Sequence, residues 1–412
     1  MASMSDIKSL QPPLRFADFK ECWQNKTLDE TVNFFSGLTY SPNNIVKSNG
    51  TLVLRSSNVQ NGQLTFNDNV YVNSNVVNSS NVKIGDIAVV VRNGSKSLIG
   101  KHAQVLVSMP NTVIGAFMTG IRTNQSGYIN ALLDTPLFKK AVDKNLGATI
   151  NQITTGAFKE MEFNFSSSDK EQTQIGDFFQ NIDKQLTLHQ VKHRKLQQLK
   201  KAMLGKMFPK AGAKVPEVRF AGFTGDWEER PLSALCTKTY GGGTPTTSND
   251  SYWNGETAWI QSSDLDERLF NVNPRKSITA SGLKNSATKL IPSNSIAIIT
   301  RVGVGKLALM ETPYATSQDF LSLSGLKVDA FFAVYSIKEL LKVVLHSVQG
   351  TSIKGITKEE LLMNTIMVTT IPAEQTKIGS YFQNLDRLIA LQQQQINKLK
   401  NIKQAYLKQM FI

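Results

Sequence analysis

Two long stretches of the chain carry apolar residues at heptad spacing. In residues 166–208 the apolar positions are Ile175, Phe179, Ile182, Leu186, Leu196, Met203 and Met207. In residues 371–412 they are Ile378, Phe382, Leu385, Ile389, Ile396, Leu399, Tyr406 and Met410. This spacing is typical of a helix with a narrow apolar seam, which another helix must cover. We therefore predict two long helices that use these residues for packing.

The predicted helices carry further signals at their start and in their middle. Ser168 and Glu171 form a capping-box pattern, in which the glutamate reaches back to the helix start. The middle of each seam is polar, with His189 and His193 in the first helix and Gln392 in the second. In an antiparallel pair these residues would meet, and we predict that they fix the register at some cost in stability. A metal site at the two histidines is the alternative, but it lacks a third ligand.

Each of the two remaining stretches mixes β-branched runs, typical of strands, with turns rich in Asn, Ser and Gly. One helix is expected over about residues 130–145 and another over about 329–348. They end near Gly147 and Gly350, which can cap a helix in the left-handed conformation. The mixture predicts an α+β domain in each stretch.

The chain is also an internal duplication. The segment EQTQIGDFFQNID at residues 171–183 recurs as EQTKIGSYFQNLD at residues 374–386. The segments that precede the two domains, called front ends below, repeat as well. Their shared residues are Arg15, Phe16, Phe19 and Trp23 in the first copy, which match Arg219, Phe220, Phe223 and Trp227 in the second. We therefore predict two copies of one unit. The predicted boundaries are 1–23 for an N-terminal segment, 24–165 for the first domain, 166–208 for the first long helix, 209–227 for a linker, 228–370 for the second domain and 371–412 for the second long helix.

Composition narrows the class of function. The 412 residues hold 46 Lys and Arg against 32 Asp and Glu, and the net charge of +14 favours a polyanionic partner, with nucleic acid first. The two cysteines, Cys22 and Cys236, lie in unlike contexts and do not suggest a disulfide framework or a zinc site. The N-terminus lacks a signal-peptide pattern, and no stretch approaches the ~18 apolar residues of a membrane span. We expect a cytoplasmic protein without a membrane partner.

No catalytic constellation stands out in the sequence. The segment RVGVGKL at residues 301–307 superficially resembles a phosphate-binding loop, yet it lacks the GxxxxGK[ST] spacing and a hydroxyl after Lys306. An amino-methyltransferase motif, a catalytic triad and a nuclease-like cluster are also missing. We therefore predict no catalytic residue, no metal and no cofactor in this chain.

Candidate DNA-contacting residues follow from the repeat. Arg55 and Gln261 occupy matching positions, and Arg suits guanine edges whereas Gln suits adenine edges. Basic residues near the two Gly-Lys pairs are candidate phosphate anchors, with surface solubility as the alternative, and the run Tyr240–Pro245 either approaches a phosphate or is only a turn. The predicted set is Tyr40, Arg55, Ser56, Ser57, Asn58, Arg92, Asn93, Lys96, Lys101, Gly242, Gly243, Thr244, Gln261, Ser262, Ser263, Asp264, Arg301 and Lys306.

The front-end pattern P-x-x-R-F-x-x-F-x-x-x-W, at Pro216–Trp227 and less fully at Leu14–Trp23, and the duplicated E-Q-T-x-I-G-x-[FY]-F-Q-N-[IL]-D helix starts resemble the specificity subunit of Type I restriction–modification systems. The resemblance covers nearly the whole chain. The segments Gly241–Pro245, Trp259–Leu265 and Ile84–Gly100 also look like the target-recognition domains of that family. One departure is that the first long helix lacks the proline that opens the second.

The resemblance implies an α+β fold of two tandem target-recognition domains, each followed by a long helix, with the helices packed as an antiparallel coiled coil of pseudo-twofold symmetry. Each domain would read one half of a bipartite target in double-stranded DNA, and the helices would set the spacer. The helices would also dock two modification subunits, which carry S-adenosylmethionine and methylate adenine, and restriction subunits would join outside. The alternatives left by the residues are a self-contained, pseudo-dimeric DNA-binding regulator and a coiled-coil scaffold that binds no DNA.

Overall fold

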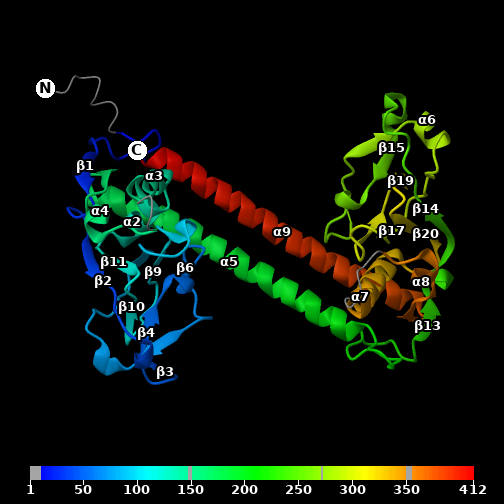
Figure 1. Cartoon of the computed structure of the whole chain (residues 1–412), viewed down its shortest axis with the longest axis horizontal. Coiled ribbons are helices and arrows are strands. Elements are labelled where there is room, and N and C mark those ends of the chain that lie inside the picture. The colour runs from blue at the N-terminus through cyan, green and yellow to red at the C-terminus, as the bar shows by residue number, and fades with distance from the viewer. Residues whose placement is uncertain (1–10, 147–150, 271, 349–354) are drawn as a thin grey trace. The chain divides into compact units, whose positions relative to one another are not determined.

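The computed structural model describes residues 11–146, 151–270, 272–348 and 355–412, so the two predicted glycine caps, Gly147 and Gly350, lie outside the described residues. The chain divides into two compact units (Figure 1). Unit 1 comprises the chain up to Gln190 together with Gln393–Ile412, and unit 2 comprises Val191–Gln392. Each unit therefore contains one globular domain and one half of each long helix.

Unit 1 is built on an antiparallel sheet of order β2-β11-β8-β9. These strands are Asn33–Ser36, Met118–Arg122, Ile87–Val90 and His102–Gln104. A second sheet has the order β10-β4-β7-β3, with β10 and β4 parallel, and its strands are Thr112–Ile114, Thr51–Leu54, Val70–Val72 and Ile45–Val46. Two antiparallel pairs complete the unit: β1 (Gln24–Thr27) with β12 (Glu162–Phe165), and the hairpin of β5 (Val59–Gln60) with β6 (Gln63–Leu64).

Unit 2 repeats the main sheet strand for strand, but among its described strands β3 and the β5–β6 pair of unit 1 have no counterpart. Its main sheet has the order β14-β20-β17-β18, with strands Cys236–Gly241, Phe320–Leu326, Ser295–Ile299 and Leu307–Met310. The second sheet, β16-β15-β19, again contains a parallel pair and consists of Lys276–Ile278, Trp253–Ile260 and Tyr314–Thr316. The pair β13 (Glu228–Pro231) and β21 (Thr365–Val368) corresponds to β1 and β12. The predicted duplication and the predicted α+β class are both confirmed.

Apart from the two long helices, the helices differ between the units. Unit 1 has α2 (Ser126–Leu133), α3 (Pro136–Asn145) and α4 (Thr155–Lys159), whereas unit 2 has α6 (Ala280–Lys284), α7 (Ala330–Val348) and α8 (Lys358–Met363). The prediction of a single helix over 130–145 is wrong, because Pro136 cannot continue α2. Thr135 instead caps α3, with its hydroxyl accepting from the backbone N–H of Phe138 at 3.2 Å.

The two predicted long helices are present as α5 (Asp169–Met207) and α9 (Pro372–Met410). Within unit 1 the ring centroids of Phe178 and Tyr406 lie 4.9 Å apart, and further along α5 the carboxylate of Asp183 binds Lys403. The helix halves therefore run antiparallel. The buried heptad residues are Ile175, Phe179, Ile182, Leu186, Met207, Ile378, Phe382, Leu385, Ile396 and Met410, while Leu196, Met203, Ile389, Leu399 and Tyr406 are half-buried. His189 and Gln392 are half-buried as well, and their role in register stays a prediction.

Glu171 does not complete the capping box, although the hydroxyl of Ser168 accepts from its backbone N–H at 3.4 Å. Its fully buried carboxylate instead accepts from Arg15 at 2.6 and 2.9 Å, from the indole N–H of Trp23 at 3.2 Å and from the hydroxyl of Ser166. We call the Arg15–Glu171 pair and its partners the clamp of unit 1.

Unit 2 has the equivalent clamp, in which Glu374 accepts from Arg219 at 2.7 and 2.8 Å and from the hydroxyl of Thr369. The two most strongly repeated motifs of the sequence, the front end and the helix start, are thus bound to each other within each unit. The clamp ties the N-terminal segment of each copy to the first turn of its long helix.

The end of each long helix completes the core of a unit. In unit 1, the ring of Phe411, after the end of α9, lies 6.0 Å from Trp23 and 6.0 Å from Phe179. In unit 2, Phe208, after the end of α5, lies 6.2 Å from Trp227 and 5.9 Å from Phe382. Each long helix therefore begins in the domain of its own copy and ends in the core of the other copy's domain. For this reason the compact units do not coincide with the sequence repeats.

Candidate nucleic-acid interface

The segments around Arg55 and Gln261 form the same short turn in both units. After β4 and β15 the chain enters the 3-10 turns η3 (Ser56–Asn58) and η8 (Ser262–Asp264). The side chain of Asn58 accepts from the backbone N–H of Arg55 at 2.9 Å, and that of Asp264 accepts from the N–H of Gln261 at 3.1 Å. Asn58 is fully buried. We therefore assign Asn58 and Asp264 to support of the turn rather than to a DNA-contacting surface.

Several predicted residues of unit 1 come together beside this turn. Asn93 donates from its amide to the hydroxyl of Ser56 at 2.8 Å. Arg92 is exposed, and its guanidinium lies 5.0 Å from the centre of the Phe117 ring. The half-buried Arg55 pairs with the exposed Asp68 at 2.8 Å. Because this pair is partly solvated, its guanidinium can exchange the carboxylate for a phosphate or a base at modest cost. We call Arg55, Ser56, Arg92, Asn93 and Phe117 the unit 1 edge.

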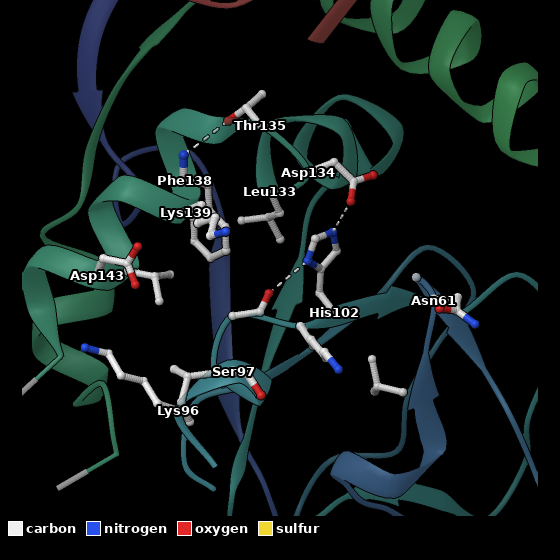
Figure 2. A pocket seen from close by; sticks show the side chains of 16 residues that line it. Asn61, Lys96, Ser97, His102, Leu133, Asp134, Thr135, Phe138, Lys139 and Asp143 are labelled. Atoms are coloured by element: carbon white, nitrogen blue, oxygen red, sulfur yellow. Dashed lines mark hydrogen bonds and ion pairs between the residues drawn. The ribbon is translucent and has the colours of Figure 1, made fainter. Parts of the chain in front are cut away.

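Lys96 and Lys101 line a hollow of about 680 Å³ in unit 1, next to Asn61 and Lys139 (Figure 2). A neighbouring hollow of about 410 Å³ is lined by Ser57 and Lys101, among others. The ammonium groups are exposed, and the walls join η3 to the Gly100-Lys101 turn. These hollows place the predicted cationic residues within reach of a polyanion that contacts the unit 1 edge.

A buried charged network lies below the larger hollow. The imidazole of His102 contacts the carbonyl of Gly100 at 3.1 Å and the carboxylate of Asp134 at 3.5 Å, and Figure 2 shows both contacts. Burial alone would lower the pKa of His102, but the adjacent carboxylate of Asp134 outweighs this effect and raises the pKa. Asp134 also binds Lys403 of α9 at 2.6 Å. The network therefore links the globular domain to the helix pair.

Unit 2 arranges its predicted residues differently. Thr244 is exposed and donates to the side chain of Gln318 at 2.7 Å. A Cβ at Gly242 would lie 1.9 Å from the carbonyl oxygen of Ser317, and one at Gly243 would lie 2.5 Å from a backbone nitrogen. The two glycines thus permit close packing inside the unit.

The remaining predicted residues divide between surface and support. Arg301 and Ser263 are exposed, and Gln261 and Ser262 are half-buried. Lys306 donates to the backbone carbonyl of Leu265 at 3.0 Å, so it holds the end of η8. Tyr40 is half-buried and packs on a small apolar cluster around Leu38.

Sequence reasoning missed Phe117, because an apolar side chain carries no DNA-binding signal of its own. It also missed both clamps. In the described parts of the chain there is no group of three or more His, Cys, Asp or Glu side chains that could hold a metal ion. Over the same residues, none of the helices has the length and apolar character needed to span a membrane.

Comparison with known proteins agrees with this architecture. The family described as Type I restriction modification DNA specificity domain matches residues 20–200 and again residues 224–401. The specificity subunit of the Type I restriction enzyme MjaIX from Methanocaldococcus jannaschii is 26% identical over 196 residues, which is 45% of this chain and 44% of that protein. The specificity subunit of the Type I restriction enzyme EcoR124I/EcoR124II from Escherichia coli is 39% identical over 87 residues, covering 20% and 21%.

A solved structure shows the same fold over the whole chain. The S subunit of a Type I restriction–modification system from M. genitalium has a TM-score of 0.66 at 15% identity, and the match covers 98% of this chain and 99% of that one. The matched stretch spans less than half of each curated relative named above. The two family matches, in contrast, cover most of the sequence and coincide with the two copies of the fold. This chain therefore belongs to the family of Type I restriction modification DNA specificity domains.

Proposed function

We propose that this chain is the DNA-specificity subunit of a Type I restriction–modification complex. Unit 1 would read one half of a bipartite target in double-stranded DNA and unit 2 the other half. The observation that carries the proposal is that two units of one topology present different side chains at equivalent turns, Arg55 in one and Gln261 in the other. The net charge of +14 supplies the attraction to the phosphates.

The long helices are the proposed docking site for two modification subunits. Leu188 on α5 and Leu391 on α9 are 45% and 41% exposed and occupy equivalent positions of the repeat. Exposed leucines at equivalent positions suit two copies of one partner. In this proposal the helices set the spacer, and restriction subunits join outside in the cytoplasm.

Catalysis is assigned to the partners. S-adenosylmethionine would be bound by the modification subunits, which would methylate adenine, and this chain would supply recognition alone. Its residues hold DNA in two ways: cationic side chains such as Arg92 and Arg301 bind phosphates, and the side chains beside them contact base edges.

The experiment is to purify the chain with its modification subunits and to map the methylated adenines. We expect one asymmetric bipartite sequence with a gap of constant length. Replacing Arg92 or Arg301 with Ala should weaken binding to all sequences alike and flatten the salt dependence by about one unit of slope. Methylation without sequence preference by the intact complex would refute the proposal.

A self-contained regulator makes the opposite prediction for the helix surface. Leu188→Glu together with Leu391→Glu should abolish assembly with modification subunits and leave the chain folded, because both side chains are exposed. Specific DNA binding should then be weakened. A regulator that needs no partner would keep its full specific affinity after the same change.

A further inference from the structure

One residue of the unit 1 edge, Phe117, has a structural counterpart in unit 2. In unit 1 the backbone N–H of Val91 donates to the carbonyl of Phe117 at 3.1 Å, and in unit 2 the N–H of Thr300 donates to that of Asp319 at 2.8 Å. The strands that follow these residues pair in the same register, Met118 with Val90 and Phe320 with Ile299. Phe117 and Asp319 are therefore equivalent.

The backbone at this position is kept while the chemistry of the side chain changes completely. Phe117 has an apolar ring that is 51% exposed, whereas the half-buried carboxylate of Asp319 accepts from the hydroxyl of Ser317 at 3.2 Å. Arg55 and Gln261 show the same behaviour. A kept scaffold with changed side chains is what two readers of different half-sites require.

Contacts with Val91 and Arg92 fix the position of Phe117. The backbone carbonyl of Phe117 accepts from the N–H groups of both Val91 and Arg92. The Arg92 guanidinium lies over the face of the ring, 5.0 Å from its centre. The neighbouring Gly115 approaches the side chain of Arg55, since a Cβ there would lie 3.9 Å from its Cγ. A lone exposed Phe is ordinary on a protein surface, but the guanidinium of Arg92 packs on this one, and Arg55 lies beside Gly115, two residues away in the chain.

The chemistry of the ring selects what it can read. Phenylalanine has no hydrogen-bond donor or acceptor, and the apolar feature of a base edge in the major groove is the 5-methyl group of thymine. We propose that Phe117 is a specificity-determining residue that contacts the 5-methyl group of a thymine in the half-site read by unit 1. This inference rests on the proposed function.

The test uses the complete complex with its modification subunits and duplexes that carry its mapped target. Each thymine of both half-sites is replaced in turn by deoxyuridine, which removes the methyl group alone, and Kd is measured by fluorescence anisotropy. We expect one replacement to weaken binding about fourfold, as expected for loss of one buried methyl group. In the Phe117→Ala complex, thymine and deoxyuridine at that position should bind equally.

Leu106→Ala is the matched control. Leu106 is an apolar side chain that is 67% exposed, comparable to Phe117. It lies near the opposite end of β8, because it follows β9, whose end pairs with the start of β8, whereas Phe117 adjoins the end of β8. This variant should keep the fourfold preference. Retained recognition of the other half-site checks that the Phe117→Ala complex is folded.

Two results would overturn the inference: no thymine whose methyl group matters, including a target half-site that lacks thymine, or a preference that persists in Phe117→Ala. A wild-type complex that does not distinguish its mapped target from unrelated duplex would instead refute the proposed function, and this inference with it. The wild-type measurement therefore separates the two failures.

Discussion

Removing the arginine of one clamp should loosen one unit and leave the other intact. Arg15→Met deletes two of the hydrogen bonds to Glu171, those at 2.6 and 2.9 Å, together with the compensating charge. The carboxylate stays fully buried, and two neutral donors, Trp23 and Ser166, remain on it. Breaking a buried ion pair by removing one partner costs about 3–5 kcal/mol. Because two donors remain, we expect a value near the lower end, about 3 kcal/mol.

Amide hydrogen exchange on the full-length chain is the suitable assay, since unfolding of two units is not a two-state process. In Arg15→Met the opening free energy of β1, β12 and the first turns of α5 should fall by about 3 kcal/mol. Peptides of unit 2 should exchange as in the wild type. The duplication supplies the matched control, because Arg219→Met should give the mirror result.

A double variant isolates the physical cause. Adding Glu171→Gln to Arg15→Met removes the uncompensated charge but keeps a side chain of similar shape, so most of the lost protection should return. If Arg15→Met changes exchange by less than about 1 kcal/mol, or if the double variant is as labile as the single one, a buried and otherwise unpaired carboxylate is not the cause.

Three further predictions concern the helix pair and the network below the hollow. Gly176→Ala should destabilise unit 1 by about 1–3 kcal/mol, because the added Cβ would lie 2.7 Å from the backbone of α2. Gly205→Ala, in the part of α5 that belongs to unit 2, has open space and should stabilise that unit by about 0.5–1 kcal/mol. Amide hydrogen exchange measures both changes unit by unit. Lys403→Met removes the cation that Asp134 and Asp183 share, although Asp134 keeps its contact with His102. Because both carboxylates are partly solvated, exchange protection of unit 1 should fall by about 1–2 kcal/mol, more than in Lys200→Met, where the single carboxylate keeps the hydroxyl of Tyr335. The pKa of His102 is raised in the folded chain, so its contribution to stability is present below its unfolded pKa of about 6.5 and is lost as pH rises through the folded pKa; His102→Gln should therefore destabilise more at pH 5.5 than at pH 9, and an equal loss at both would contradict this assignment.

The sequence by itself determined the duplication, the two long helices and the α+β character of each domain. These properties depend on local periodicity and on similarity between segments, which are visible without a fold. Heptad residues such as Phe179 and Phe382 are buried as their spacing predicts. Arg55 and Gln261 were likewise found as equivalent because the segments around them still resemble each other.

Only the tertiary structure decided which groups meet. Arg15 and Glu171 are 156 residues apart, and local patterns suggested a capping role for Glu171 because nothing along the chain reports a distant arginine. The same holds for Asn58, whose polarity suggested a base contact until the turn around it proved to enclose it. The exposure of Phe117 and its equivalence to Asp319 follow from backbone pairing between strands. These strands are far apart in sequence, so local patterns do not report which face of a loop they cover.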